Sequence, residues 1–334
     1  MSQARVAWAL RYEEQRPDAL VQSLVEVTSL DPFALSIDAM RARRGTKWRH
    51  YPDDVLPAWV ADMDFAVPEP VQRAVERVVH DQDYGYFWRP VEDTLAAAFA
   101  DRMRDCFAWP IDPELVLPIT DLVQAMVATI MVYSEPGDGV VVQTPLYPPF
   151  LSSITVTERR RVDNELLDNG TRFVVDVDGL RRDVDQTTRM IMVCNPHNPT
   201  GRVFERSELE AIGSVAVDRD LVIVCDEIHA DLVYPGHRHV PMGTLAPDIA
   251  SRTITLSSAT KGFNIAGLKC ALIHFGSAEL RARFERRFPG RLLGQPSSVG
   301  LDATVAAWRD GQPWLDQVLR RLHCNRDRLF EWVH

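Results

Sequence analysis

The 334-residue chain has a deficit of positive charge, with 37 Lys and Arg against 47 Asp and Glu and a formal net charge of -10. Nucleic acids and acidic membranes are held mainly by clustered Lys and Arg, so this balance argues against both as partners. The short basic runs at residues 159–161 and 281–287 are better explained as solvated surface or as the rim of a subunit interface.

Long apolar runs and paired cysteines are also missing. The longest apolar stretch, residues 122–133, contains Gln124 and is too short to span a bilayer. The first residues lack the apolar core and cleavage site of a signal peptide. Five cysteines form no CxxC pair, and three of them lie in apolar, strand-like runs, as reduced thiols do. We therefore expect a cytoplasmic protein. The five are Cys106, Cys194, Cys225, Cys270 and Cys324.

The sequence has no internal repeat, no low-complexity segment and no GxGxxG turn after its first predicted strand. The missing glycine turn argues against a nicotinamide-dependent dehydrogenase. What the chain has is length and 46% hydrophobic residues, enough for one large domain and a smaller one.

From residue 66 onward, helical and strand patterns alternate. The predicted strands are short, continuously apolar runs bounded by turn residues, which is typical of strands covered on both faces. Their alternation with helices predicts an α/β fold with a mostly parallel sheet flanked by helices. Helices are predicted at 69–79, 92–107, 122–133 and 314–333, and strands at 139–143, 190–194, 221–225, 253–256 and 269–275.

Chemically useful side chains follow four of these strands. In parallel sheets, ligands bind at the carboxyl ends of the strands. The four ends, at residues 144–147, 195–201, 226–229 and 257–261, offer an aromatic ring, an amide, a carboxylate with an imidazole, and an amine. A cofactor with an aldehyde, a pyridine nitrogen and a phosphate needs such a set: an amine for a Schiff base, a carboxylate for the pyridine nitrogen, and a ring for stacking. No metal site is predicted.

Seven short motifs, in this order and spacing, resemble the fold type I pyridoxal-phosphate enzymes of the aspartate aminotransferase superfamily. Within it they are most similar to the cystathionine β-lyase or C–S lyase branch of the class I and II aminotransferases. Each motif is weak alone, and the set covers the chain from about residue 31. The motifs lie at residues 47–48, 56–65, 84–86, 143–147, 195–203, 226–233 and 258–268.

The resemblance implies roles for three residues at the strand ends. Lys261 would form the Schiff base with pyridoxal phosphate and act as the base at the substrate Cα. Asp226 would pair with the pyridine nitrogen, and Tyr147 would stack on the ring. The alternatives are an ordinary strand-end lysine, an aspartate that caps a helix, and an aromatic side chain that only packs.

His229 and Asn198 match positions near the 3-oxygen of the cofactor, and Asn198 also matches a residue that helps to hold the substrate carboxylate. Asn195 is a rival for this role, but the spacing to residues 200–201 favours Asn198. Both His229 and Asn198 could instead be purely structural; for Asn198 the reason is that Asn-Pro pairs make turns without any function.

For the phosphate, the resemblance implies four contributions. The backbone of Asp121 and Leu122 begins a helix, where free N–H groups suit an anion, although the Asp121 carboxylate would repel phosphate unless it points away. Ser258 offers a hydroxyl group, and Lys269 stands where many relatives have arginine. Tyr86 matches a tyrosine that reaches the phosphate in a neighbouring subunit, which implies a homodimer; packing is its alternative.

The resemblance also divides the chain. Family members continue into a small C-terminal domain whose arginine binds the substrate carboxylate, whereas this sequence reaches only residue 334. Truncation of the sequence and real absence of the arginine are both open. In either case, we expect Leu319, Leu322 and Leu329 of the last helix to be exposed. The divisions are an extension at 1–30, part of a small domain at 31–65, the large cofactor domain at 66–308, and an interdomain helix that starts an incomplete small domain at 309–334.

The predicted reaction is β-elimination from cystathionine or another cysteine S-conjugate, which releases a thiol, pyruvate and ammonia. Residues 59–65 and His229 resemble the lyase branch more than general transaminases. Two alternatives are an aminotransferase and a cofactor-binding homologue that is catalytically weak and acts as a structural or regulatory partner. The substrate stays open.

Overall fold

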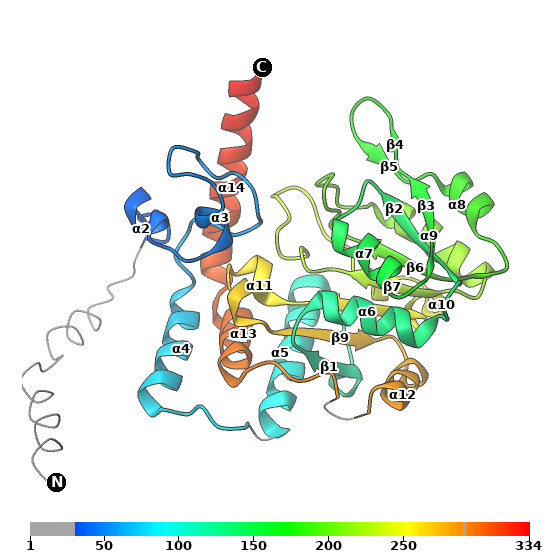
Figure 1. Cartoon of the computed structure of the whole chain (residues 1–334), viewed down its shortest axis with the longest axis horizontal. Helices are drawn as coiled ribbons and strands as arrows, with labels where there is room; N and C mark the ends of the chain where they lie inside the picture. Colours follow the sequence, from blue (N-terminus) through cyan, green and yellow to red (C-terminus); the bar gives the residue numbers. More distant parts are fainter. Residues whose placement is uncertain (1–30, 88, 290–291) are drawn as a thin grey trace, which may run out of the picture.

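The fold is built around a seven-stranded sheet with helices on both faces (Figure 1). This computed structural model describes residues 31–87, 89–289 and 292–334, so the predicted extension at 1–30 lies outside the described residues. The strand order is β1-β9-β8-β7-β6-β2-β3. The strands are β1 (Val116–Ile119), β2 (Gly139–Thr144), β3 (Arg160–Glu165), β6 (Thr188–Cys194), β7 (Val222–Asp226), β8 (Thr253–Ser257) and β9 (Ala271–Phe275).

Most neighbouring strands are parallel, as predicted. Strands β3, β2, β6, β7 and β8 run in the same direction, and only β9 is antiparallel to its neighbours β8 and β1. A separate antiparallel hairpin joins β4 (Leu167–Asp168) to β5 (Phe173–Val174). The mostly parallel α/β sheet predicted from the sequence is therefore confirmed.

The helices surround this sheet. The four predicted helices are all present, with α6 at the predicted bounds. The helices are α2 (Ile37–Arg41), α3 (Thr46–Arg49), α4 (Glu69–Asp81), α5 (Arg89–Phe107), α6 (Leu122–Tyr133), α7 (Pro148–Val156), α8 (Val177–Asp183), α9 (Arg206–Asp218), α10 (Pro247–Ala250), α11 (Ala259–Gly262), α12 (Ala278–Arg287), α13 (Ser298–Asp310) and α14 (Gln312–Val333), with short 3-10 turns η1 (Pro113–Leu115), η2 (Met242–Thr244) and η3 (Ala266–Leu268). None of the described helices is both long enough and apolar enough to cross a bilayer.

Three hydrophobic clusters fill the layers. Helices α6, α7 and α12 cover one face of the sheet. Helices α8, α9 and α10 cover the β3-to-β7 part of the other face, and α4, α5, α13 and the start of α14 pack beside β1 and β9. Successive strand residues point to opposite faces, so Val140 and Val142 join one cluster and Val141 joins another. Both faces are apolar, which explains the continuous apolar runs.

The two short hairpin strands β4 and β5 and two strands of the seven-stranded sheet were not predicted, and these last two are its edge strands. β3 is polar, with only alternate residues buried, and β1 contains Pro118, which an edge position tolerates. β9 begins at Ala271, two residues later than predicted, because Lys269 has a left-handed backbone with φ of 51°.

The last helix only partly matches its prediction. Leu319 and Leu322 pack against the cluster of α4, α5 and α13, so the expectation that they are exposed is wrong. Leu329 is exposed, as are Phe330, Trp332 and Val333. The final turns of α14 extend beyond the rest of the described chain (Figure 1).

A buried ion pair ties four elements together beneath the strand ends. Arg102 of α5 donates to Asp231, which follows β7, at Nη2–Oδ1 2.6 Å and Nε–Oδ1 3.1 Å. The guanidinium also donates to Gln312 at the start of α14 and lies over the ring of Phe263, just after α11. Asp231 in turn contacts Gly262, where an added Cβ would come within 2.9 Å of the aspartate Cβ.

We predict that Asp231→Ala lowers the free energy of unfolding by about 3–5 kcal/mol, because the buried guanidinium loses its counter-charge. Asp101→Ala, which breaks the exposed pair with Arg104 on the same helix, is the matched control and should change it by less than about 1 kcal/mol. Urea unfolding of both variants measures the difference. Equal, small losses in the two variants would contradict the assigned role.

Candidate active site

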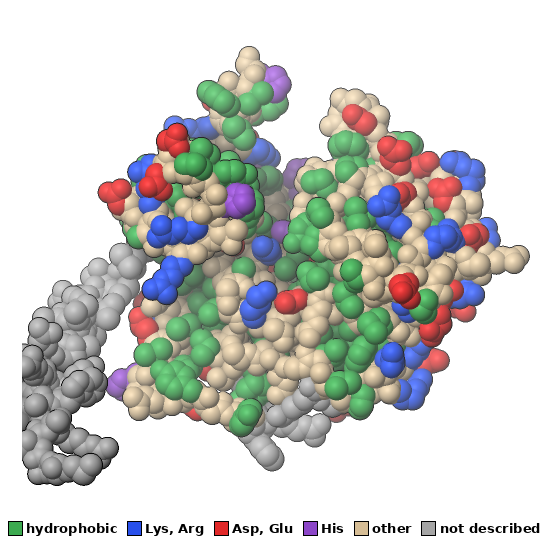
Figure 2. All heavy atoms as spheres, in the orientation of Figure 1, with side chains coloured by type: hydrophobic (Ala, Val, Ile, Leu, Met, Phe, Trp, Pro, Cys, Tyr) green, Lys and Arg blue, Asp and Glu red, His purple; other side chains and the backbone are tan. Residues whose placement is uncertain are grey.

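A cavity of about 810 Å³ opens at the carboxyl ends of β2, β6, β7 and β8. In the space-filling view the surface is hollowed between the N-terminal segment, residues 31–65, and the body that contains the sheet (Figure 2). Nine of the ten predicted site residues line this cavity. They are Asp121, Leu122, Tyr147, Asn198, Asp226, His229, Ser258, Lys261 and Lys269.

Asp226 is the last residue of β7 and lies at the floor of the cavity, only 4% exposed. Burial raises its pKa to about 7; the backbone N–H of Ile228, which donates to Oδ1 at 3.0 Å, opposes this shift, and the nearby Glu227 charge adds to it. Among the described residues, no donor binds the other oxygen, Oδ2. A buried carboxylate with one unpaired oxygen fits a protonated pyridine nitrogen.

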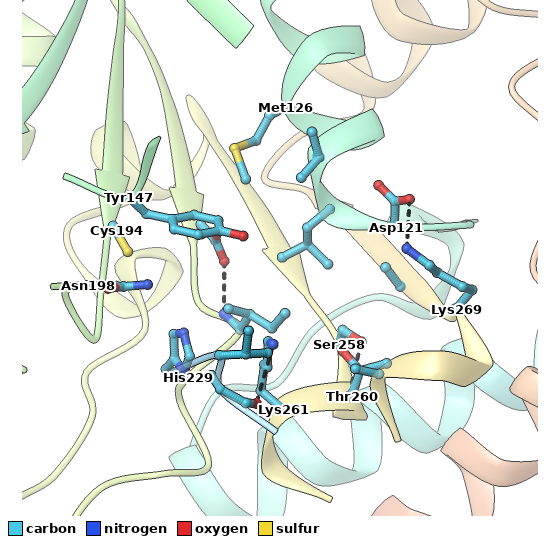
Figure 3. Close-up of a pocket in the computed structure, with 18 of the residues that line it drawn as sticks. Asp121, Met126, Tyr147, Cys194, Asn198, His229, Ser258, Thr260, Lys261 and Lys269 are labelled. Carbon is cyan, nitrogen blue, oxygen red and sulfur yellow. Dashed lines mark hydrogen bonds and ion pairs between the residues drawn. The ribbon is translucent and has the colours of Figure 1, made fainter. Parts of the chain in front are cut away.

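Lys261 and His229 approach the same space from two elements (Figure 3). Lys261 is in the short helix α11, directly after β8, and its Nζ lies 3.5 Å from the carbonyl oxygen of Ala61. Burial, and after it the Lys261 charge, lower the pKa of His229 to about 4. The imidazole is therefore neutral at pH 7 beside a primary amine.

Tyr147 and Asn198 lie on the side of the cavity opposite Asp121 and Lys269 (Figure 3). Burial, then the Asp226 charge, raises the pKa of Tyr147. The Tyr147 N–H donates to the Asn198 carbonyl oxygen at 3.1 Å, which joins the loops after β2 and β6. Asn195 is buried away from the cavity, because its Oδ1 accepts from the Phe204 N–H at 3.0 Å. The geometry therefore favours Asn198 over Asn195.

At the predicted phosphate end, the Asp121 carboxylate folds back over the start of α6 and does not point away. Its Oδ1 accepts from the Gln124 N–H at 2.9 Å, and its Oδ2 lies 3.5 Å from Lys269 Nζ. The N–H groups of the first helical residues have no partner inside a helix, so Leu122 and Val123 still offer donors. An anion here must compete with Asp121 for Lys269.

Ser258 already uses its hydroxyl proton. Its Oγ donates to the Cys270 carbonyl oxygen at 2.6 Å, accepts from the Thr260 N–H at 3.1 Å, and lies 2.8 Å from Thr260 Oγ1. Since a carbonyl oxygen can only accept, the serine proton goes to Cys270. The role of Ser258 as a phosphate donor therefore requires this bond to break, and that role stays a prediction.

Tyr86 is the predicted residue that the structure does not bring to the cavity. It lies in the loop between α4 and α5, and its side chain is fully exposed. The prediction assigned it to the site of a neighbouring subunit, and a single chain leaves that assignment open.

Sequence reasoning assigned no role to several lining residues. Trp59, Val60 and Ala61 come from the N-terminal segment, and Met126, Cys194, Thr120, Val123 and Thr260 come from the body. Residues 56–65 were noticed only as a motif, because a tryptophan, a valine and an alanine carry no titratable group. The carbonyl oxygen of Ala61, which accepts from Lys261, has no signal in a sequence.

Residues 60–333 match the family model described as aminotransferase class I and II, and the chain belongs to this family. It is 33% identical to the cystathionine beta-lyase PatB of Bacillus subtilis (strain 168) over 273 residues, which are 81% of this chain and 70% of that protein. It is 35% identical to a putative cystathionine beta-lyase of Mycobacterium leprae (strain TN), over 90% of this chain and 74% of that one.

A similar solved structure is that of a putative PLP-dependent beta-cystathionase from Corynebacterium diphtheriae. Its TM-score is 0.82 at 32% identity, and the match covers 88% of this chain and 76% of that one. The amine, the buried carboxylate, the aromatic ring and the amide around the cavity fit the pyridoxal phosphate that the predicted aminotransferase-like fold implied.

The raised pKa of Asp226 predicts a pH-dependent stability for the cofactor-free protein. The folded state keeps this carboxyl protonated to about pH 7, whereas the unfolded chain ionises near its ordinary value, so the folded state binds the extra proton between about pH 4 and pH 7. Relative to Asp226→Asn, the wild-type protein should lose stability as the pH rises through this window, at up to about 1.4 kcal/mol per pH unit.

Urea unfolding of both proteins at a series of pH values measures this difference. Burial also lowers the pKa of some histidines, such as His197 and His274. These histidines titrate in both proteins, so their contributions to the pH dependence cancel. Asp163→Asn, at an exposed position on β3, controls for loss of a carboxylate at the surface. Parallel stability curves for the wild-type protein and Asp226→Asn would contradict the prediction.

Proposed function

We propose that the chain is a pyridoxal-phosphate-dependent C–S β-lyase, which cleaves cystathionine or another cysteine S-conjugate to a thiol, pyruvate and ammonia. The observation that carries the proposal is one cavity in which an amine, Lys261, and a buried carboxylate, Asp226, face the same space. The cystathionine beta-lyase relatives, which match most of the chain, support the choice of reaction.

When bound, pyridoxal phosphate supplies an electron sink that stabilises negative charge at the Cα of an amino acid. Asp226 favours that state because its free oxygen can hold a proton at the pyridine nitrogen. Tyr147 would stack on the ring, and the neutral His229 and the Asn198 amide would orient polar substituents. Lys261 Nζ would hold the aldehyde group; once the amino group of the substrate has displaced it, the free amine would accept the proton from Cα, and the thiolate could leave from Cβ.

An aminotransferase is the second candidate, because the family model carries that description. The same lysine would return the proton to a cofactor carbon, and the amino group would pass to a keto acid. A catalytically weak homologue is the third candidate, favoured by the ion pair of Asp121 with Lys269 and the occupied hydroxyl of Ser258.

We also propose a cytoplasmic homodimer, with residues 31–65 and 309–334 as parts of a smaller domain beside the large one at 66–308. The exposed aromatic rings of Tyr84 and Tyr86 support an interface between two copies. Five free cysteines, three of them buried, suit a reducing compartment.

We predict that the purified chain loaded with pyridoxal phosphate releases pyruvate from L-cystathionine, and that Lys261→Ala lowers kcat by about 10²–10⁴-fold, since a positioned general base contributes this much. Lys269→Ala is the matched control: it should weaken cofactor binding, and excess cofactor should restore turnover. Pyruvate and the visible absorbance of the bound cofactor are measured together.

The other outcomes separate the candidates. Keto-acid-dependent transfer of the amino group without pyruvate would establish the aminotransferase. Cofactor absorbance without either product would establish the weak homologue. Full activity of Lys261→Ala would rule out the mechanism.

The dimer proposal predicts complementation between two inactive variants. In a heterodimer of Tyr86→Ala and Lys261→Ala, one of the two sites has its own Lys261 and a wild-type Tyr86 from its partner. Activity should recover to about half of the wild-type value per dimer, as one intact site of a two-fold symmetric pair requires. Co-expression with two affinity tags isolates the heterodimer. A Tyr84→Ala variant serves as the control, and absence of recovery in purified heterodimers would refute the shared site.

A further inference from the structure

Besides Lys261 itself, the side chain of Asn264 joins the lysine turn to the segment that forms the cavity wall of Trp59, Val60 and Ala61. Asn264 Nδ2 donates to the carbonyl oxygens of Met63, at 2.9 Å, and Phe65, at 3.1 Å. Its Oδ1 accepts from the Met63 N–H at 2.9 Å. These three hydrogen bonds join segments 199 to 201 positions apart in the sequence, and they engage the segment just after the residues that line the cavity.

The backbone of Asn264 suits this role. It lies just after α11 with φ of 59°, a left-handed conformation that Asn adopts more readily than most residues with a side chain. The Ile265 N–H donates to the Thr260 carbonyl oxygen at 3.0 Å, so the turn that carries Lys261 and the turn that carries Asn264 are one unit. The amide therefore has a fixed position relative to Lys261.

The other anchors of the segment are mostly local to the N-terminal region. Lys47 Nζ donates to the Asp62 carbonyl oxygen at 2.9 Å and pairs with Asp64 Oδ2 at 2.6 Å. Trp48 Nε1 donates to Asp64 Oδ1 at 2.7 Å, and Trp59 Nε1 donates to the Lys47 carbonyl oxygen at 3.3 Å. These bonds shape the segment, but they do not fix its distance from the lysine turn.

Val60, inside the segment, shows that the wall is held under strain. It has φ of 61°, which is unfavourable for a β-branched residue, and it is 41% exposed. Such a conformation persists only where the surroundings enforce it. Asn264 engages Met63, three residues further along, and Trp314 Nε1 donates to the Ala66 carbonyl oxygen at 3.0 Å, so both side chains hold the segment against the body.

We propose that Asn264 is a positioning residue that fixes the wall of Trp59, Val60 and Ala61 relative to Lys261 Nζ. It thereby determines which substrate side chains the cavity admits. The part that concerns cysteine S-conjugates rests on the proposed lyase function. Asn264 touches neither substrate nor cofactor in this role; it acts through the segment whose Ala61 carbonyl oxygen accepts from Lys261.

The first test measures the wall without turnover. Asn264→Gly deletes the amide but keeps the left-handed backbone accessible. Amide hydrogen exchange in peptides that cover residues 57–65 should accelerate by about tenfold or more, because the Met63 N–H loses its acceptor and the segment loses two further hydrogen bonds. The matched control is Glu158→Gly, an exposed left-handed position after α7, which should leave these peptides unchanged. Unchanged exchange in Asn264→Gly would overturn the proposal.

A second variant, Asn264→Asp, keeps an acceptor for the Met63 N–H but loses both donations. It should give intermediate exchange, and it provides the readout if the glycine variant does not fold. Exchange in Asn264→Asp that equals the wild-type rate would also overturn the proposal.

The second test separates positioning from general stability. In Asn264→Gly, the KM for L-cystathionine should rise about tenfold, because substrate binding must then also order a segment that has lost three modest hydrogen bonds. The kcat and the retention of pyridoxal phosphate should change less than about threefold. The KM values for S-methyl-cysteine and for cystathionine should become more similar, so that their ratio approaches one. A common fall in kcat for both substrates at an unchanged KM ratio would overturn the specificity role. If the wild-type protein shows no lyase activity, only the proposed function fails, and the exchange result decides the role of Asn264.

Discussion

Burial of the central strands on both faces is the constraint that shapes this molecule. Between two apolar layers, β6 and β7 have almost no place for a polar side chain except at their ends. Parallel strands bring those ends to one edge of the sheet, so the polar groups of distant segments converge there. The same burial raises the pKa of Asp226 and lowers that of His229. Architecture and electrostatics of the site thus have a common origin.

The sequence predicted the central strands and four helices because each depends on a local pattern, an apolar run or a helical period. It predicted nine cavity-lining residues from the polar groups at strand ends and from the resemblance to a known family. It failed where the determining partner is remote. Edge strand β3 has no apolar run, and Leu319 and Leu322 are covered by α4, α5 and α13. The three hydrogen bonds of Asn264 to residues about 200 positions away leave no periodic signal.

Side-chain orientation was the other limit. The start of α6 was predicted as an anion site through its backbone, but whether the Asp121 carboxylate points away or folds back depends on Gln124 and Lys269 together. Likewise, the sequence shows only that Ser258 has a hydroxyl group that can donate. The structure shows that this group donates to the Cys270 carbonyl oxygen. Residue identity set the available chemistry, whereas hydrogen-bond partners determine which part of it is free.

At the predicted phosphate end of the cavity, the Asp121 carboxylate competes with other anions for Lys269. A tethered carboxylate acts as a permanently present ligand at high effective concentration, and both partners are partly exposed, so the pair is worth no more than about 1 kcal/mol. Any anion that reaches Lys269 therefore competes with a carboxylate that belongs to the chain itself.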